Sequence, residues 1–247
     1  DTVANKVKVL GPDINASNYR FDPVDRNTIR YGLGAVKGTG EQAVNVILKA
    51  REAGGPFKDL FDFCQRCDKR MVNRRTIEAL IKAGAFDCIA PSTGTGQADR
   101  HKLLAGIAMD FAEQAERNAM QTSLFDIGSN AEEHAPQYIA VKPWDEKEQL
   151  MQEKTALGFF FSGHPYNTSK KELSRFIRRP LNRLEPAKEM TMLAGLVVGV
   201  RTQMTRRGKM LFVQLDDGTG MIEVSVFNEL FEAERAKIVT DEVLVIE

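Results

Sequence analysis

The stretch GLGAVKGTGEQAV, residues 32–44, combines four glycines with a helix-favouring run that follows them directly. Chains often approach phosphate groups in this way, because glycine adopts positive φ angles and leaves the backbone N–H groups open to a ligand. Three kinds of phosphate are candidates: that of a dinucleotide, of a nucleoside triphosphate, or of a nucleic-acid backbone. The spacing of the glycines and the surrounding elements discriminate between the three.

The glycine spacing disfavours both kinds of nucleotide. A dinucleotide fingerprint reads GxGxxG after a buried strand and lies in a βαβ unit. Here the next glycine after Gly34 is Gly38, and the residues that follow are patterned as helices. A P-loop reads GxxxxGK[ST], but Thr39 rather than a lysine follows Gly38. An enzyme of the dehydrogenase type is therefore the least favoured functional hypothesis.

A helix-hairpin-helix motif fits the stretch better. Lys37, Gly38, Thr39 and Gly40 would form the hairpin between a short helix and a second helix. The second helix would direct the positive end of its dipole at a DNA phosphate, which is then held without any reading of bases. Glu41 is unfavourable beside a phosphate, and its role would be to complement the helix dipole. A hairpin that serves only for packing is the alternative.

Two arginines are further candidates for contact with the DNA backbone. Arg74 and Arg75 open a predicted helix whose apolar face contains Ile77, Leu80 and Ile81. Cationic side chains at the start of a helix can meet a phosphate, and a solvated helix face is the alternative.

The cysteines predict thiols rather than a metal site. Cys64 and Cys67 form a CxxC pair, with Cys88, His101 and His164 as candidate additional ligands. A zinc site needs four ligands at suitable spacing, and no second CxxC is present, so buried thiols are favoured. An odd total of three cysteines also argues against a disulfide framework and for a reducing cytoplasm.

We predict no catalytic residue and no metal site in the chain. Asp216 and Asp217 are adjacent, but Gly-Thr-Gly follows them, which is typical of a hairpin turn rather than of a metal site. His164 in the sequence SGHP has no Ser/Asp arrangement beside it, so we interpret it as a structural corner.

Composition and charge indicate a globular protein that contacts a polyanion in patches. The formal net charge is zero, with 28% charged and 43% hydrophobic residues. Residues 66–82 and 170–188 are basic, whereas residues 113–153 are acidic. This distribution suits a nucleic-acid-binding chain, and ordinary solvated helix faces are the alternative. The longest apolar run, residues 192–200, is far shorter than the roughly 20 residues that span a bilayer, so we expect no membrane partner.

The elements that must position these residues follow from the hydrophobic periodicity. Residues 1–31 alternate as strands do, and helices are expected near 98–120, 144–157 and 169–179. The absence of a starting methionine indicates a segment of a longer chain. The predicted class is α+β with several domains, namely a β-like region at 1–31, a helix-hairpin-helix domain at 32–120, a linker at 121–140, connector helices at 141–189, and an OB-type barrel at 190–247.

The last of these domains is expected to be a truncated OB-type β-barrel. Near residue 190 the period changes to two, which predicts three strands joined by RRG and DDGTG turns. A helix at 227–238 and a fourth strand at 241–247 would follow. A small Greek-key barrel of the OB type has a fifth strand, so we expect the barrel to be incomplete at the C-terminus.

Five segments together resemble the C-terminal part of the catalytic α subunit of bacterial DNA polymerase III, the C-family replicative polymerase. They are IRYGLGAVKGTGEQAVNVILKAR, GPFKDLFDFC, VNRRTIEALIKAGAFD, LGFFFSGHP and LDDGTGMIEVSVF. The resemblance implies a parent DNA-directed DNA polymerase, a nucleotidyltransferase, whose Mg²⁺-binding palm aspartates lie upstream of this segment. The implied partners are primed duplex DNA, single-stranded DNA and other subunits of the replicative holoenzyme. The resemblance also implies that residues 1–31 are the tail of the polymerase fingers region. It implies no cofactor for the segment itself.

The resemblance also gives a meaning to the polar linker. Its sequence Gln121-Thr-Ser-Leu124-Phe125 is similar to the short Qxx(L/M)F peptide by which bacterial polymerases bind the sliding clamp. Leu124 and Phe125 would fill an apolar pocket on the clamp while the Gln121 amide bonds at its rim. A hydrophobic latch onto a neighbouring helix is the alternative.

The barrel domain carries the candidates for single-strand binding. Arg206, Arg207 and Lys209 lie in its first predicted turn, with Phe212 and Phe227 on neighbouring strands. Charge and base stacking together suit a single strand, whereas the phenylalanines could equally belong to the barrel core.

A stand-alone helix-hairpin-helix and OB module for DNA repair is the alternative to the polymerase segment.

Overall fold

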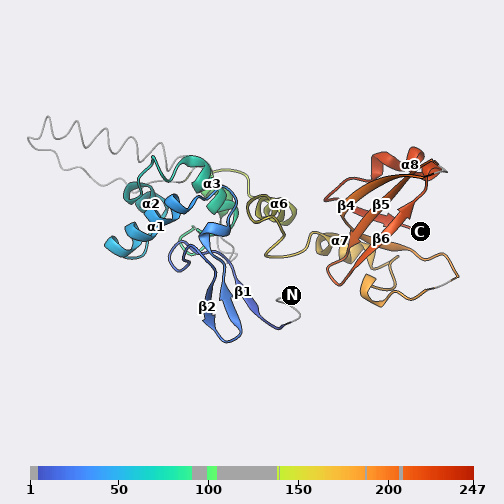
Figure 1. Cartoon of the computed structure of the whole chain (residues 1–247), viewed down its shortest axis with the longest axis horizontal. Coiled ribbons are helices and arrows are strands. Elements are labelled where there is room, and N and C mark those ends of the chain that lie inside the picture. Colours follow the sequence, from blue (N-terminus) through green and yellow to red (C-terminus); the bar gives the residue numbers. More distant parts are fainter. Residues whose placement is uncertain (1–4, 91–98, 105–137, 139, 187, 206–207) are drawn as a thin grey trace, which may run out of the picture. The chain divides into compact units, whose positions relative to one another are not determined.

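The computed structural model describes residues 5–90, 99–104, 138, 140–186, 188–205 and 208–247. The chain divides into two compact units, Asp1–Phe161 and Ser162–Glu247. We call the first the helical unit and the second the barrel unit (Figure 1).

A small three-stranded sheet opens the helical unit. It consists of β1 (Lys8–Leu10), β2 (Asp22–Asp25) and β3 (Thr28–Arg30), in the order β1-β3-β2. β1 pairs in parallel with β3, and β2 pairs with it in antiparallel fashion. In Figure 1 the tight hairpin of β2 and β3 projects away from the helices. The period-two pattern at the start of the sequence therefore corresponds to real strands.

Helices form the rest of the helical unit. They are η1 (Leu33–Ala35), α1 (Glu41–Gly54), α2 (Leu60–Arg66), α3 (Arg74–Lys82), α4 (Arg100–Leu104) and α6 (Glu146–Leu157). Three of them start where a short polar side chain accepts a hydrogen bond from a first-turn N–H group, the usual reason for a helix to begin there. The capping residues are Asp59 for α2, Asn73 for α3 and Asp145 for α6. Of the helix expected at 98–120, residues 105–120 lie outside the described residues.

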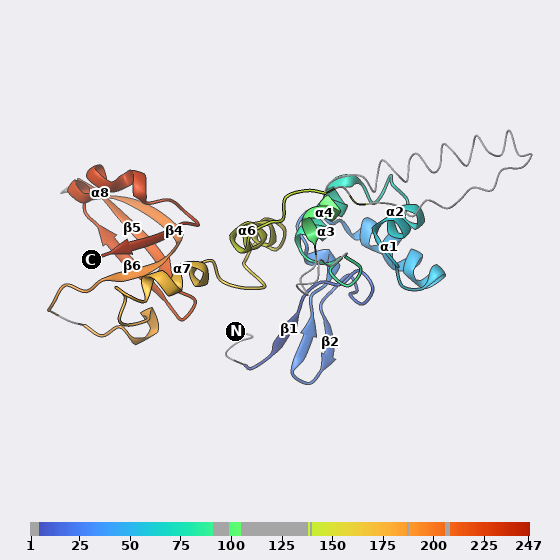
Figure 2. The same ribbon diagram turned by 180° about the vertical axis from the view of Figure 1, so that it is seen from behind.

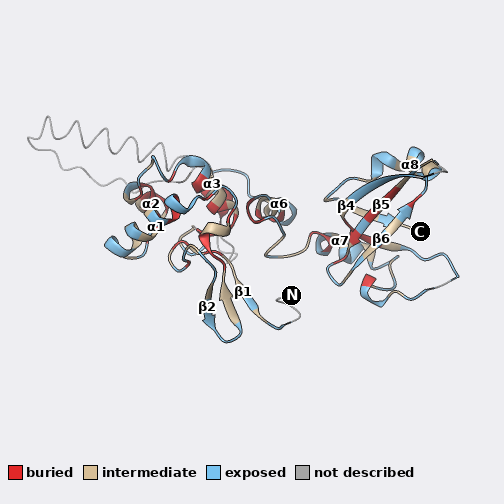
Figure 3. Cartoon of the chain, viewed as in Figure 1, coloured by how far each residue is buried: buried red, intermediate tan, exposed pale blue. Residues whose placement is uncertain are grey.

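Buried residues gather along the helices of the helical unit (Figure 3), and aromatic rings are among those of its core. The Phe63 ring packs edge-on against those of Phe57 and Phe86, with both centroid distances at 4.9 Å. All three side chains are almost completely buried. Phe57 precedes α2, Phe63 lies in it and Phe86 follows α3, so this cluster packs α2 against the segment that follows α3.

Helix α6 is attached to this core by a buried ionic group as well as by packing. Arg100 of α4 donates to Glu153 of α6 at 2.8 Å and, through Nε, to Asp87 at 2.7 Å. Glu153 is 1% exposed, and its second carboxylate oxygen accepts the N–H of Phe161. Figure 2 shows α4 beside α3, against which α6 also packs. The segment after the linker is thus an integral part of the helical unit.

The barrel unit begins with short helices, α7 (Tyr166–Leu173) and η2 (Leu181–Arg183). The helix expected around 169–179 is therefore shifted towards the N-terminus. Pro165 at its N-cap has a helical φ of −56°, which favours a start at that point. At the other end the N–H groups of both Phe176 and Ile177 return to the carbonyl of Leu173, which turns the chain out of the helix.

A four-stranded antiparallel sheet completes the barrel unit. Its strands are β4 (Leu193–Thr205), β5 (Gly208–Asp216), β6 (Met221–Val226) and β7 (Val243–Ile246), in the order β6-β5-β4-β7. Between β6 and β7 lie α8 (Asn228–Glu234) and η3 (Arg235–Lys237). The predicted succession of three strands, a helix and a further strand is confirmed. The inner face of the sheet forms the core, where Leu211, Val213 and Leu215 of β5 are buried.

Candidate nucleic-acid interface

The predicted hairpin joins η1 to α1, and its glycines have two separate roles. Gly38 has a φ of +87°, in the left-handed region that favours glycine. Gly40 is the N-cap of α1 in an extended conformation, and a Cβ added there would meet no heavy atom within 4 Å. A Cβ on Gly32 would instead lie 2.5 Å from the carbonyl carbon of Arg20, and one on Gly34 would overlap the Tyr19 ring. The first pair of glycines therefore serves close packing, and the second pair shapes the exposed turn.

The buried Thr39 stabilises the hairpin through hydrogen bonds within the turn. Its hydroxyl donates to the carbonyl of Leu33 at 2.7 Å and is also within hydrogen-bond distance of the Val36 carbonyl, and its own N–H returns to Val36. The residue is 9% exposed, while its neighbours Gly38 and Gly40 are exposed. Thr39 thus contributes the shape of the turn, and its polar groups are already engaged within the chain.

The start of α1 offers backbone donors at this turn. The first N–H groups of any helix lack intrahelical acceptors, and Gly40 brings no side chain that could accept from them. In α2, α3 and α6 an Asp or Asn side chain does so. The uncapped first turn of α1 together with its dipole favours an anion at this position. Glu41 lies in that turn with its side chain exposed.

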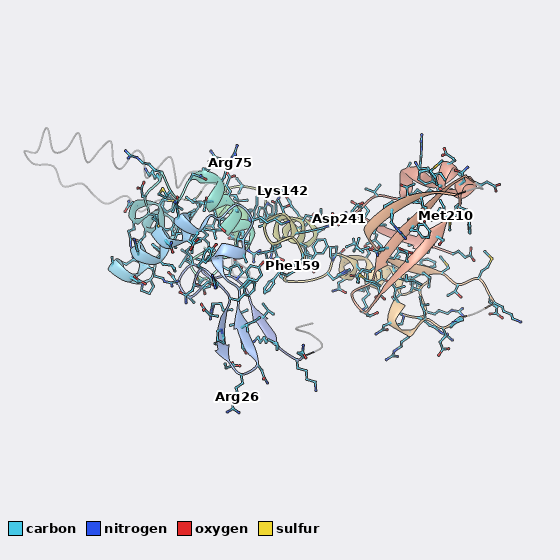
Figure 4. The ribbon with its side chains drawn as sticks, in the orientation of Figure 1. Arg26, Arg75, Lys142, Phe159, Met210 and Asp241 are labelled. Atoms are coloured by element: carbon cyan, nitrogen blue, oxygen red, sulfur yellow. The ribbon has the colours of Figure 1, made fainter. Side chains whose placement is uncertain are left out.

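Two basic residues are candidates to accompany the hairpin, Lys37 within it and Arg75 on α3. The Lys37 N–H donates to the Ala156 carbonyl near the end of α6, and Lys37 is exposed. A Cβ on Gly38 would lie 4.0 Å from that of Ala79 in α3. Arg75 shares a face of α3 with Ala79 because the two are four residues apart. Its side chain is exposed (Figure 4). The structure therefore places Lys37, Gly38 and Gly40 on one turn, and Arg75 one helical turn away from the point where α3 meets it.

Arg74 has a different environment from Arg75. Its Nε donates to Glu78 at 2.8 Å in an exposed ion pair within α3. Such surface pairs are weak, about 0.3–0.5 kcal/mol at this helical spacing, so a phosphate could displace the glutamate. The competing carboxylate nevertheless makes Arg74 the less available of the two arginines.

The sheet of the barrel unit exposes a second group of candidates on its outer face. The Arg201 guanidinium lies 4.6 Å from the centroid of the Phe212 ring and 3.5 Å from the Glu223 carboxylate. Phe212 points away from the buried side of β5, as does Met210 two residues earlier (Figure 4). Phe227 is 68% exposed. Neither phenylalanine is among the core residues, so both lie outside the barrel core.

Of the predicted basic turn, the structure describes Lys209. The ammonium group of Lys209 lies 5.0 Å from the centroid of the Phe231 ring of α8. Arg206 and Arg207 lie outside the described residues, as do Gln121, Leu124 and Phe125 of the linker. Arg201 was not among the residues singled out from the sequence, because its role depends on which face of a strand it occupies.

The Asp216-Asp217 pair forms a hairpin turn, as predicted. Asp217 accepts hydrogen bonds from the N–H groups of Thr219, Gly220 and Leu181. Burial raises the pKa of this carboxyl group, but the hydrogen bonds outweigh that effect and leave the pKa below its ordinary value. The carboxylate is therefore a structural acceptor that joins the β5–β6 turn to η2. The His164 Nε2 atom lies 3.6 Å from Asp216, beside the same turn.

The cysteines are free thiols. Cys64 and Cys67 are buried, and burial raises the pKa of each to about 12. Across the described residues, no group of three or more His, Cys, Asp and Glu side chains is arranged to hold a metal ion. The same part of the chain contains no helix that is both long and apolar enough to cross a membrane.

Comparison with known families defines the class of protein first. A family model described as a helix-hairpin-helix motif matches residues 6–95. A second model, described as an OB-fold nucleic acid binding domain, matches residues 192–247. The chain therefore combines a helical helix-hairpin-helix region with an OB-fold domain of the nucleic-acid-binding class, as the sequence predicted.

Individual relatives define the similarity more closely than the two family models do. The chain is 45% identical over its whole length to DNA polymerase III subunit alpha of Neisseria meningitidis serogroup B, of which it covers 21%. It is 41% identical to the subunit of the same name from Pseudomonas aeruginosa, with 98% of the chain and 22% of the relative covered. For Escherichia coli K12 the identity is 36%, over 97% of the chain and 21% of the relative. The resemblance to the α subunit of bacterial DNA polymerase III is therefore confirmed, and the chain spans about a fifth of the length of these relatives.

Proposed function

We propose that the chain is a DNA-binding and sliding-clamp-binding segment of a bacterial replicative DNA polymerase. Its similarity to polymerase α subunits over its whole length is the observation that carries the proposal. The parent chain would be a cytoplasmic DNA-directed DNA polymerase that works with other holoenzyme subunits. Its catalysis would use Mg²⁺ held by carboxylates outside this segment.

In this proposal the helix-hairpin-helix region binds the backbone of the primed duplex. Gly38 and Gly40 keep the turn open, the uncapped first turn of α1 supplies N–H donors, and Lys37 and Arg75 supply charge. None of these groups distinguishes one base from another, so the grip would be independent of sequence. That property suits a polymerase, which must hold every duplex that it makes.

Replacing Gly40 by aspartate should weaken duplex binding without loss of stability. The carboxylate would cap α1, which on average stabilises a helix by a few tenths of a kcal/mol relative to glycine. It would also occupy the α1 donors and repel a phosphate, so we expect roughly a tenfold weaker affinity for primed duplex DNA. Fluorescence anisotropy gives the affinity, and thermal unfolding gives the stability.

Asn45→Asp is the matched control for this substitution. It adds the same charge to an exposed position of α1, one turn beyond the hairpin. Its effect on duplex affinity should stay below about threefold, because exposed charges away from the contact are screened by salt. Equal duplex affinities of Gly40→Asp and the unmodified chain would favour a hairpin that serves only for packing.

The barrel unit would bind the single-stranded template on its outer face. Arg201 over Phe212, together with the exposed Phe227, provides the combination of cation and aromatic ring on which bases stack. Lys209 of β5, together with Arg206 and Arg207, would add charge at the first turn.

Clamp binding through Gln121, Leu124 and Phe125 is the third part of the proposal. The motif would tether the polymerase and raise its effective concentration at the primer end. Changing both Leu124 and Phe125 to alanine should reduce the affinity for a bacterial sliding clamp roughly a hundredfold or more, because two apolar anchors are lost. Surface plasmon resonance measures this, and the parent polymerase should retain distributive synthesis.

The control for the clamp experiment lies inside the same motif. Thr122→Ala together with Ser123→Ala changes the positions between the proposed contacts and should leave clamp affinity unaltered. The assignment fails if both double variants bind the clamp alike, or if distributive synthesis is lost together with clamp binding.

A further inference from the structure

A basic segment of the barrel unit lies between the two regions that the family models match. Residues 96–191 belong to neither match. Within this interval, four arginines and one phenylalanine are exposed over a short stretch, which we call the arginine strip: Arg175, Phe176, Arg178, Arg179 and Arg183.

The arginine strip is held against the barrel at its C-terminal end. The Leu181 N–H donates to Asp217 at 2.8 Å, and the Leu181 side chain is buried in the barrel core. A Cβ on Gly220 would lie only 3.2 Å from the Asn182 backbone N, so the β5–β6 turn and η2 are in close contact. Upstream, the turn bonds from Phe176 and Ile177 to Leu173 fix the start of the strip at the end of α7. The arginines are thus presented from a defined backbone.

Little negative charge within the described residues balances these cations. The Arg179 guanidinium lies 3.8 Å from Glu185, with both side chains more than half exposed. Arg175, Arg178 and Arg183 have no ion pair and no side-chain hydrogen bond in the part of the chain that the structure describes. A group of cations without internal partners attracts a polyanion.

The exposed ring of Phe176 indicates which kind of polyanion would bind. Its side chain is 59% exposed although it is apolar, and it lies between Arg175 and Arg178 in the strip. Arginines alone would suit any phosphate or carboxylate array. An exposed ring among them suits unpaired bases, which stack on aromatic side chains while the phosphates meet the cations.

We propose that the arginine strip is a second contact for single-stranded nucleic acid, adjoining the OB sheet but outside it. The inference rests on the proposed single-strand binding by the barrel unit and adds a site to it. A strand long enough to extend beyond the sheet would place phosphates on Arg178 and Arg179 and stack a base on Phe176.

The affinity test uses the whole chain and labelled oligothymidine of about 20 nucleotides, longer than the roughly 4–16 that one OB fold covers. Arg178→Gln with Arg179→Gln should weaken binding roughly ten- to thirtyfold at about 0.1 M salt, since each single-strand phosphate contact contributes about 0.7 to the salt slope. The log–log salt slope should become shallower by about 1.4. The control Arg26→Gln with Lys49→Gln removes two exposed cations from the helical unit and should change neither quantity.

A stacking test uses Phe176→Trp in a chain whose single native tryptophan, Trp144, is replaced by phenylalanine. Oligothymidine should quench the new fluorophore, because a stacked base contacts the indole ring. Quenching by polyglutamate but not by oligothymidine would overturn the inference in favour of an acidic protein partner.

Different results would overturn the arginine strip and single-strand binding by the barrel unit as a whole. Tight binding of oligothymidine with an unaltered affinity and salt slope in Arg178→Gln/Arg179→Gln would overturn the arginine strip and leave the OB sheet as the binding site. An unmodified chain that binds no oligothymidine would overturn single-strand binding as a whole, and the strip with it.

Discussion

Replacing Arg100 by methionine is expected to lower the free energy of unfolding of the helical unit by about 3–5 kcal/mol. Arg100 is 7% exposed and donates to both Asp87 and Glu153. Methionine would fill much of the same volume but leave the Glu153 carboxylate buried without its cation. Removal of one partner from a buried pair is costly for that reason. Urea unfolding followed by circular dichroism measures the loss.

Two further variants distinguish the cost of an unpaired buried charge from the cost of lost packing. Arg74→Met removes the exposed partner of Glu78 and should cost no more than about 0.5 kcal/mol. Arg100→Met combined with Glu153→Gln removes the unpaired charge but keeps an acceptor for the Phe161 N–H group. This double variant should regain a large part of the stability. An Arg100→Met loss as small as that of Arg74→Met would contradict a stabilising role for the buried group.

Gly32→Ala is expected to destabilise the helical unit by about 3 kcal/mol or more, at the upper end of the usual cost of overpacking. The added Cβ would lie 2.5 Å from the Arg20 carbonyl carbon and 2.6 Å from the Tyr19 oxygen. Both atoms belong to the backbone, and the N–H groups of Leu33 and Gly34 bond to the Asn18 and Tyr19 carbonyls in the same segment. The strain therefore cannot be relieved by rotation of a side chain. Thermal unfolding should show a lower Tm.

Gly40→Ala is the comparison for this substitution. It adds the same methyl group eight positions later, where no heavy atom lies within 4 Å of it, and Gly40 has a φ of −82° that any residue adopts. Its cost should remain below about 1 kcal/mol, the usual effect of alanine at an N-cap. Similar losses for both variants would refute the division of the glycines into packing and hairpin positions.

The barrel unit could be predicted in detail because its determinants are local. The alternation in β5 places Leu211, Val213 and Leu215 on the inner face, and a period of two is visible in the sequence without knowledge of any partner strand. The turn at Asp216-Asp217 was predictable for the same reason, since short polar side chains and glycine form turns with their own neighbours.

The helical unit was predicted less completely because its determinants are distant in sequence. The spacing of the glycines indicated a hairpin. It did not reveal which glycines serve packing, because that depends on the contact between Gly34 and the distant Tyr19. Arg100 and Glu153 are 53 positions apart, and each resembles a surface residue in its own helix. Long-range burial of this kind leaves no periodic signal.

Tyr138 and the α4–α6 contact have a geometric consequence for the linker. The Tyr138 ring packs 5.1 Å from that of Phe61, and Arg100 joins α4 to α6, so the chain is fastened to the same unit on either side of residues 105–137. The thirteen residue steps from Phe125 to Tyr138 span at most about 45 Å even when fully extended. The surface of any partner that binds Phe125 must therefore come within about that distance of Tyr138, whatever path the chain takes.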